Sequence, residues 1–159
     1  MNPETRNAPD TARQQWLAVL AQAPRAALAP HGERVLADYR FEALRAPEAG
    51  LVMLRGRASN SGARFNLAEA TVTRCALRYR TAQGAVSVGL GYVLGRDEAR
   101  AQWVAALDAL LQQPDQQALL LAEVIAPLRA AREQQLAAER ARVEASRVQF
   151  FTLQTEASA

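Results

Sequence analysis

Four arginines are the residues of this sequence whose type and spacing best fit binding chemistry. Arg55 and Arg57 are two positions apart in a strand-like segment, so their side chains share one face. Arg74 stands in the next strand-like segment, and Arg96 stands directly before Asp97, a residue type that caps helices. The start of a helix there would add a dipole that favours an anion. Because guanidinium groups bind phosphate oxygens in bidentate fashion, the pattern predicts substrate or phosphate binding by these four arginines.

Other interpretations of these arginines stay open. A solvated sheet face can carry scattered arginines without any ligand, and the same side chains can form salt bridges to partner chains. A polyanion-binding module is a further alternative, but the strand segments lack the clustered aromatic side chains that stack nucleic-acid bases. All 19 basic residues are Arg, which points to a compositional bias, and the net charge is only +3. We therefore expect no nucleic-acid partner.

No other group of residues is complete enough for catalysis, so the catalytic residues stay unknown. His31, the only histidine, lies in a Pro-His-Gly run that predicts a bend or the start of another helix, and a structural or surface role is expected for it. Cys75, the only cysteine, excludes an internal disulfide and is expected to be a small core residue. Gly89, Gly91 and Gly95 follow a strand pattern, which favours a bulge or close approach of another backbone over a dinucleotide loop. We expect no metal site and no cofactor of the chain's own.

The period of the apolar residues indicates one α+β domain over residues 10–127, after a polar leader at 1–9 that we expect to be disordered. The N-terminal part reads as helices. Alternation over 38–95, broken by turn signals such as Pro47 to Gly50, predicts an antiparallel sheet of about four strands. The period changes at Arg96-Asp97, and helices follow.

Residues 128–159 are predicted to form a C-terminal helical arm and a strand-like tail. The helical part has few large apolar side chains, too few to be buried deeply in its own domain. The tail is the opposite, because Val148, Phe150, Phe151 and Leu153 lie within six residues. We expect these four side chains to form a partner interface, since they would be an aggregation hazard in water. The alternative is that the tail folds back as an extra strand of its own sheet.

The targeting signals are few. The first ten residues have no apolar core of a signal peptide, and no run approaches the roughly 18 apolar residues of a membrane span. A cytoplasmic setting and no membrane partner are therefore expected.

Six segments, in order along the chain, resemble the PhnG family over about residues 11–154. They are residues 13–21, 50–57, 65–75, 92–97, 106–111 and 146–153. The resemblance implies a subunit of the carbon–phosphorus lyase core complex in bacterial alkylphosphonate catabolism. It implies PhnH, PhnI and PhnJ as partners in a symmetric hetero-oligomer.

In that family, the complex forms alpha-D-ribose 1-methylphosphonate 5-triphosphate from methylphosphonate and a nucleoside triphosphate, with release of adenine. The nucleoside triphosphate is a substrate of the complex, and the nucleosidase-like chemistry is ascribed to PhnI. The resemblance thus implies a mainly structural and assembly role for this chain, as a subunit of a transferase/lyase complex that is inactive alone. A direct contribution of Arg55, Arg57, Arg74 and Arg96 to the triphosphate site stays open as the alternative.

Overall fold

The chain folds into six helical segments and three strands over the described residues, 8–58 and 62–147. The strands are β1 (Phe41–Arg57), β2 (Arg64–Arg80) and β3 (Val86–Leu94). The helices are α1 (Ala8–Gln22), α2 (Arg25–Asp38), α3 (Glu98–Leu111), α4 (Pro114–Leu120) and α5 (Ala126–Ala145), with a π-helical turn, η1 (Leu121–Ile125), between the last two.

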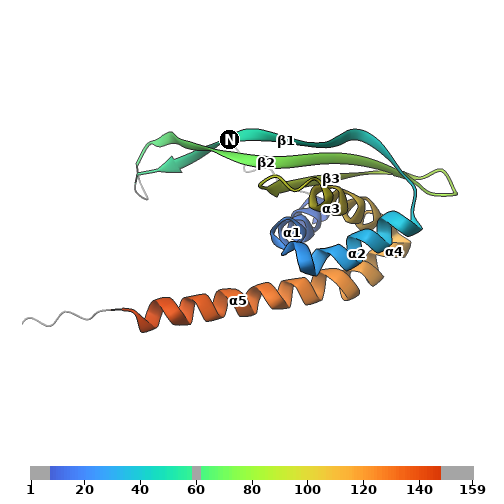
Figure 1. Cartoon of the computed structure of the whole chain (residues 1–159). Coiled ribbons are helices and arrows are strands. Elements are labelled where there is room, and N and C mark those ends of the chain that lie inside the picture. The colour runs from blue at the N-terminus through green and yellow to red at the C-terminus, as the bar shows by residue number, and fades with distance from the viewer. Residues whose placement is uncertain (1–7, 59–61, 148–159) are drawn as a thin grey trace, which may run out of the picture.

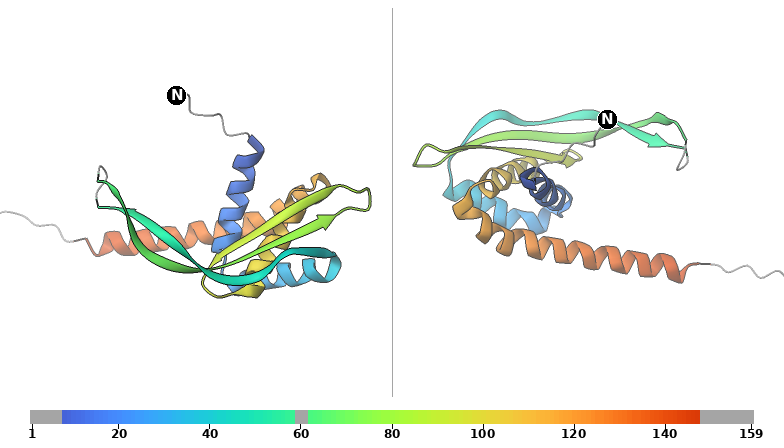
Figure 2. Two further views of the ribbon diagram at one scale, coloured as in Figure 1. Left: turned by 90° about the horizontal axis from the view of Figure 1, so that it is seen from above. Right: turned by 180° about the vertical axis from the view of Figure 1, so that it is seen from behind.

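The computed structural model in Figure 1 has two layers, a curved sheet and a group of helices that lies on one face of it. Two arms leave this body: the far ends of β1 and β2, and helix α5. Both arms project toward the same side of the body in every view of Figures 1 and 2. The β1–β2 arm and α5 therefore both extend beyond the part of the sheet that the other helices cover.

The sheet is antiparallel in the order β1-β2-β3, which confirms the α+β class but gives three strands instead of about four. The turn expected from Pro47 to Gly50 is wrong: this segment lies inside β1, and Glu48 pairs with Arg74. The pairing of β1 with β2 continues through this segment by means of register shifts between Ala43 and Glu48. Because β1 is an edge strand, a proline beside a bulge removes no ladder hydrogen bond. The turn at Gly84 is confirmed, with φ +88°.

Helix α3 rests directly on the backbone of β3. A Cβ atom added to Gly89 would lie 1.8 Å from the Ala105 carbonyl oxygen, and one added to Gly91 would lie 1.9 Å from the Ala101 carbonyl oxygen. The expected close approach of another backbone is therefore confirmed, and it explains why small residues alternate with large ones in β3. Ser87, Gly89, Gly91 and also Val93 face the helix, while Val86, Leu90, Tyr92 and Leu94 face outward.

Helix α2 packs against α3 at another glycine, Gly32. A Cβ atom added to Gly32 would lie 2.2 Å from Cγ of Trp103. The bend or helix start expected at Pro30-His31-Gly32 is wrong, because α2 continues through all three residues. Pro30 leaves one intrahelical hydrogen bond unmade, and the packing of Gly32 on Trp103 holds the helix in place despite this cost.

The start of α3 is the cap that the sequence indicated. The Asp97 carboxylate accepts a hydrogen bond of 3.0 Å from the Arg100 N–H, and it also pairs with Arg25. The buried hydroxyl of Thr73 in β2 donates to the Gly95 carbonyl at 2.7 Å and accepts from the Asp97 N–H at 3.0 Å. The connection from β3 to α3 is thereby tied to the centre of the sheet.

Pro127 explains the widened turn before α5. A proline ring clashes with the carbonyl four residues earlier, here that of Glu123, and offers it no N–H. The chain responds with the π-helical turn, in which the Ala126 N–H donates to the Leu121 carbonyl. Val124 and Ile125 stay buried, and α5 then leaves the body with Leu128 as its buried residue.

Two sequence predictions lie partly or wholly outside the described residues. Of the leader at 1–9, residues 1–7 lie outside the described residues, and α1 already begins at Ala8. The tail with Val148, Phe150, Phe151 and Leu153 lies entirely outside them. No helix of the described part of the chain is long and apolar enough to cross a membrane.

Gly89→Ala is expected to destabilise the protein strongly, because the new methyl group would overlap backbone atoms of α3 that cannot move independently. Overpacking usually costs about 1–3 kcal/mol, and contact with backbone places this variant at the upper end. Urea unfolding followed by circular dichroism measures the effect. Gly50→Ala is the matched control, because nothing lies within 4 Å of its added Cβ, and it should change stability by less than about 0.5 kcal/mol. Equal midpoints for the two variants would contradict the packing described here.

Candidate functional site

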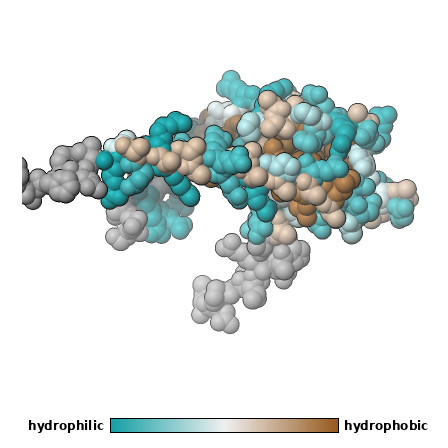
Figure 3. Space-filling model, turned by 90° about the horizontal axis from the view of Figure 1, so that it is seen from below, coloured by the Kyte–Doolittle hydropathy of each residue, from teal (hydrophilic) through white to brown (hydrophobic). Residues whose placement is uncertain are grey.

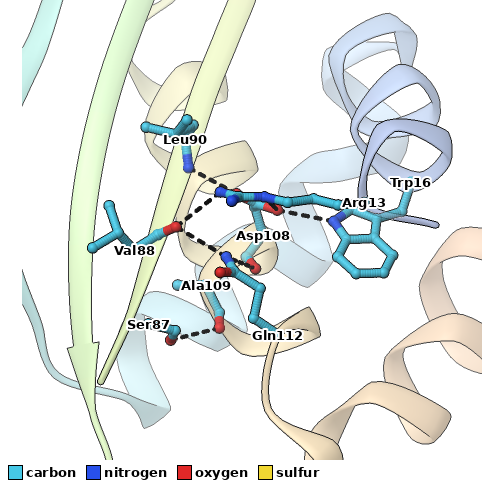
Figure 4. Close-up of polar contacts among 8 residues, drawn as sticks. All are labelled: Arg13, Trp16, Ser87, Val88, Leu90, Asp108, Ala109 and Gln112. Atoms are coloured by element: carbon cyan, nitrogen blue, oxygen red, sulfur yellow. Dashed lines mark hydrogen bonds and ion pairs between the residues drawn. The ribbon is translucent and has the colours of Figure 1, made fainter. Parts of the chain in front are cut away.

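A fully buried carboxylate, Asp108 of α3, forms the main polar cluster of the body (Figure 4). Arg13 of α1 donates to it from Nη2 at 2.7 Å and from Nε at 3.2 Å. Trp16 of α1 donates from its indole Nε1 at 2.9 Å, and the backbone N–H of Leu90 in β3 donates at 2.9 Å. Four hydrogen bonds and one positive charge therefore compensate the loss of water around Asp108.

The same cluster covers the free edge of β3. The Val88 carbonyl accepts from Arg13 Nη2 and from Gln112 Nε2, both at 2.9 Å, and the Leu90 N–H is used by Asp108. Ser87 donates to the Ala109 carbonyl at 2.8 Å, which adds a further link between β3 and α3 (Figure 4). Side chains thus occupy the groups through which another strand would pair with β3.

Sequence reasoning did not single out Asp108. The available signal was a single acid in the apolar face of α3, flanked by Leu107 and by Leu110 and Leu111. An acid at such a position needs a hydrogen-bond donor inside the protein. Arg13 of α1, one helical turn before Trp16, is the cation that donates to it. This cluster has a structural role, since its polar groups are hydrogen-bonded to one another and to the backbone of β3.

The outer face of the sheet, opposite the helices, is divided between charged and apolar side chains. Arg74 contacts Glu48 at 2.7 Å, and Arg45 contacts the same oxygen at 2.8 Å. The hydrogen bond from Arg74 lowers the pKa of Glu48, and the same bond raises the pKa of Arg74. Arg78 and Glu42 add a pair at 3.5 Å. The charged part of this face is therefore neutralised largely within the chain.

The apolar part of the outer face lies on β3, beside those ion pairs. Its exposed side chains are Val86, Leu90, Tyr92 and Leu94, and Leu94 keeps 68% of its surface in contact with solvent. A second apolar surface lies on the β1–β2 arm, whose exposed apolar side chains are Leu51, Met53, Leu54, Phe65 and Leu67. The register places Leu51 and Met53 opposite Thr71 and Glu69, on the face of the sheet that the helices cover in the body. So many exposed large apolar side chains mark interaction surfaces.

Helix α5 forms the second arm and has a different character. Val143 is 65% exposed and Leu136 is also exposed, but most of the helix is charged or Ala. From below (Figure 3), hydrophobic side chains gather on the body, while hydrophilic ones dominate the arm. The exposed apolar surface of α5 is therefore small and is surrounded by charged side chains.

The structure disperses the four arginines that the sequence singled out. Arg55 and Arg57 lie in the β1–β2 arm, and Arg55 pairs with Asn66 in the ladder. Asn66 is eight positions from Arg74 along β2, which is about 26 Å at roughly 3.3 Å per strand residue. Arg96 is exposed at the turn between β3 and α3. Arg74 is paired with Glu48, and the four side chains do not converge on one point of this chain.

The remaining chemical candidates are structural. Cys75 is 3% exposed in the core, as expected, and burial raises the pKa of its thiol to about 11. It is therefore protonated and unreactive at neutral pH. His31 lies in α2 and is partly exposed. Within residues 8–58 and 62–147, no group of three or more His, Cys, Asp or Glu could hold a metal ion.

A hollow beside the buried cluster, within the described part of the chain, gives no catalytic set either. A groove between α1 and η1 is lined by Trp16, Leu121, Ile125 and Arg129, together with Gln15 and Gln117, and no acid or histidine lines it. Such a lining offers apolar contact and a cation but no pair of groups for proton transfer. The fold and surface therefore define a protein whose described part is built for contact with other chains.

Comparison with known proteins identifies the family. Residues 11–155 match the family described as phosphonate metabolism protein PhnG. A relative from Rhizobium meliloti (strain 1021), the alpha-D-ribose 1-methylphosphonate 5-triphosphate synthase subunit PhnG, is 43% identical over 112 residues, which cover 69% of this chain and 67% of the relative. The chain belongs to the PhnG family of phosphonate metabolism proteins.

Asp108→Ala is expected to destabilise the protein by about 3 kcal/mol or more, because breaking a buried ion pair leaves charged and polar donors without an acceptor. Trp16 and the Leu90 N–H would lose their acceptor, and Arg13 would keep only the Val88 carbonyl. Denaturant unfolding, followed by tryptophan fluorescence, gives the difference. Glu48→Ala removes a carboxylate with two Arg partners on the exposed face and should shift the midpoint little. A loss of stability in Glu48→Ala that equals the loss in Asp108→Ala would refute the assigned role of burial.

Proposed function

We propose that this protein is a subunit of the carbon–phosphorus lyase core complex and that its role there is mainly structural. In this proposal the complex forms alpha-D-ribose 1-methylphosphonate 5-triphosphate from methylphosphonate and a nucleoside triphosphate, with release of adenine. Membership of the PhnG family and the name of the relative at 43% identity support the assignment. The transferase/lyase activity belongs to the assembled complex, and the nucleoside triphosphate is the complex's substrate, not a cofactor of this chain.

The observation that carries the structural role is the apolar surface left uncovered by the protein's own fold. Leu51, Leu67 and Leu94 are 63%, 62% and 68% exposed, and each lies in a strand rather than a loop. Burial of one such side chain stabilises an assembly by about 1.5–3 kcal/mol before the costs of association. Partner subunits could therefore bury the apolar side chains that the strands expose in the isolated subunit.

The partners in this proposal are PhnH, PhnI and PhnJ, with neither nucleic acid nor a membrane, in the cytoplasm. The charged outer face supports protein partners over a polyanion, because Arg45, Arg74 and Arg78 are paired with Glu48 and Glu42. Nucleic-acid binding would need such cations to be available to phosphates.

The C-terminal tail is proposed as one of the contacts with those partners. Helix α5 carries residue 147 away from the body, and Val148, Phe150, Phe151 and Leu153 follow directly. Twenty helical residues extend about 30 Å, so the tail begins well beyond the core. The described residues by themselves form a hydrophobic core around α3.

A second candidate function is direct binding of the triphosphate by arginines at the interface. It is favoured by Arg55 and Arg96, which are exposed and have no ion pair within the described residues. Since Arg55, Arg57, Arg74 and Arg96 do not converge in this chain, each would have to complete a site formed mainly by another subunit.

The first test is co-expression of the tagged chain with PhnH, PhnI and PhnJ. We expect the four proteins to co-purify and to form the ribose triphosphate product, while the isolated chain neither hydrolyses nucleoside triphosphates nor cleaves phosphonates. Removal of residues 147–159 should weaken assembly at least about tenfold, because an apolar contact is lost. Removal of 155–159 keeps the apolar segment and is the control. If the longer deletion assembles with unchanged affinity but is itself unstable, the tail belongs to its own core.

The second test separates structural from catalytic arginines. For a structural role, Arg55→Ala and Arg96→Ala should leave turnover per assembled complex within about twofold of wild type, with Arg80→Ala as an exposed control. The triphosphate is not transferred in this reaction, so an arginine that binds it holds the substrate in place, and loss of one partner of a buried charge pair costs about 2–5 kcal/mol, roughly thirtyfold or more. A loss of that size in a fully assembled complex would establish the second candidate.

A further inference from the structure

Strand β2 continues past the end of its neighbour β3. The last pair of the β2–β3 ladder is Val72 with Leu94, and the Gly95 N–H then donates to the Thr71 carbonyl at 2.9 Å. Gly95 has φ +89°, and the chain turns away there into α3. Residues 64–70 of β2 go on pairing with residues 52–57 of β1 on their other side. We call these two stretches the open shelf.

The backbone geometry shows which groups face the uncovered side of the shelf. In an antiparallel strand, successive residues direct their N–H and C=O groups to opposite sides. Thr71 directs its carbonyl toward β3, since it accepts from Gly95. The register is continuous from Thr71 to Glu69, so Glu69 directs its N–H and C=O to that same side, where β3 has ended. Its ladder partner Met53 directs its own groups to the opposite, outer edge of β1.

The other edges of the sheet are less suited to accept a strand. On β3, the Val88 carbonyl is occupied by Arg13 and Gln112, and the Leu90 N–H is occupied by Asp108. Over its first half, β1 is irregular, because the register shifts twice between residues 43 and 48. Bulges and a proline on an edge strand are devices that prevent further pairing. The shelf contains no proline, and its register shift, between Leu54 and Arg55, lies beyond Glu69.

The side chains of the shelf also require a partner. A two-stranded ribbon is marginally stable in water, and three strands with a buried face are needed for independent stability. Here the ribbon exposes Met53, Leu54, Phe65 and Leu67. A third strand placed beside β2 would extend the line of β3 and cover part of this surface.

The charges of the shelf indicate the chemistry of the strand that fits it. Arg55 and Arg64 are exposed at the far end, and Arg96 is exposed where β3 ends. Glu69 is the only acid in residues 52–57 and 64–70. The chain's own residues 148–155 contain no acid, so they do not complement these cations. A strand from another chain with acidic side chains near both ends does.

We infer that the open shelf accepts an extended, apolar and acidic segment of another subunit, which pairs with the backbone of β2 at Glu69. This inference rests on the proposed function and specifies how the partner is held. The backbone supplies affinity, as in other cases of strand addition, while Arg55, Arg64 and Arg96 select the register of the added strand. The sheet of the complex is then continuous across two chains.

Hydrogen exchange at two paired amides tests this directly. The probe is the full-length chain, alone and in the complex co-expressed with PhnH, PhnI and PhnJ, followed by mass spectrometry at single-residue resolution. The Glu69 amide should exchange at least about a hundredfold more slowly in the complex, because a new backbone bond protects it. The Met53 amide is the internal control and should change much less. Equal exchange of Glu69 in the two states overturns the inference.

Proline variants give a second, independent readout. Glu69→Pro removes an N–H that β1 does not use, and it should lower the yield of assembled complex at least about tenfold. Glu69→Ala should assemble normally, since only the side chain is lost, and Met53→Pro should have a smaller effect because it blocks the other edge. Arg96→Glu should weaken assembly in a salt-dependent way, with Arg80→Glu as control. Normal assembly of Glu69→Pro overturns the inference.

The remaining outcomes are distinguishable from one another. If the wild-type chain captures none of the three subunits, the proposed function fails and the inference fails with it. If Glu69 is already protected in the isolated chain and becomes exposed on deletion of residues 147–159, the chain's own tail occupies the shelf. Protection that rises with the concentration of the isolated chain assigns the shelf to a second copy. Both of these last results overturn the inference but leave the proposed function intact.

Discussion

Burial of the Asp108 carboxylate is the constraint on which the arrangement of the body depends. A charge without contact with water must have its donors in place, and these come from α1 and from β3, which are distant in sequence. Displacement of either element would leave the carboxylate, the Trp16 indole and the Arg13 guanidinium uncompensated. Helix α3 thus has one favourable position relative to both neighbours, and apolar packing alone would not specify it so narrowly.

The close contact of α3 with β3 determines how much of the sheet can be covered. Gly89 and Gly91 let the helix approach the strand backbone, so the helix covers that strand and the adjoining part of β2. A 14-residue helix is about 21 Å long, whereas a 17-residue strand extends about 56 Å. A single helix layer of this kind cannot cover β1 and β2 to their ends. The β1–β2 arm follows from this difference in length.

Much of the fold could be predicted from local patterns, because these patterns arise from local physics. The change of period at Arg96-Asp97 and the cap at Asp97 depend on neighbouring residues, and both are confirmed. The glycines of β3 were correctly taken as a sign of close approach. Pro47 was misleading, since a proline with a following glycine has the same sequence signal in a turn and at a bulge on an edge strand.

The candidate site was harder to predict, because it depends on contacts between distant segments. The role of Asp108 requires Arg13 and Trp16 to lie beside it, 92 and more positions away in the chain, and no periodicity encodes that. The arginines had the reverse problem. Their chemistry suggested one phosphate site, but Arg55 and Arg74 are held apart by the length of β2. Residue type indicates what a side chain can bind, whereas strand register decides which side chains can bind together.

The division between body and arms has a physical consequence for how this protein can work. The groups that stabilise the fold, Asp108 with its donors and the glycines under α3, all lie in the body. The exposed Leu51, Met53, Phe65 and Leu67 lie in the arm, as does the part of β2 that extends past the end of β3. Because the arm contributes little to the packing around α3, it can remain incomplete in the isolated chain without unfolding the body. An arm that is only marginally stable alone and is ordered by a partner makes assembly selective. Ordering the arm costs conformational entropy, and only a partner strand that pairs with both the backbone and the arginines of the arm offsets that cost.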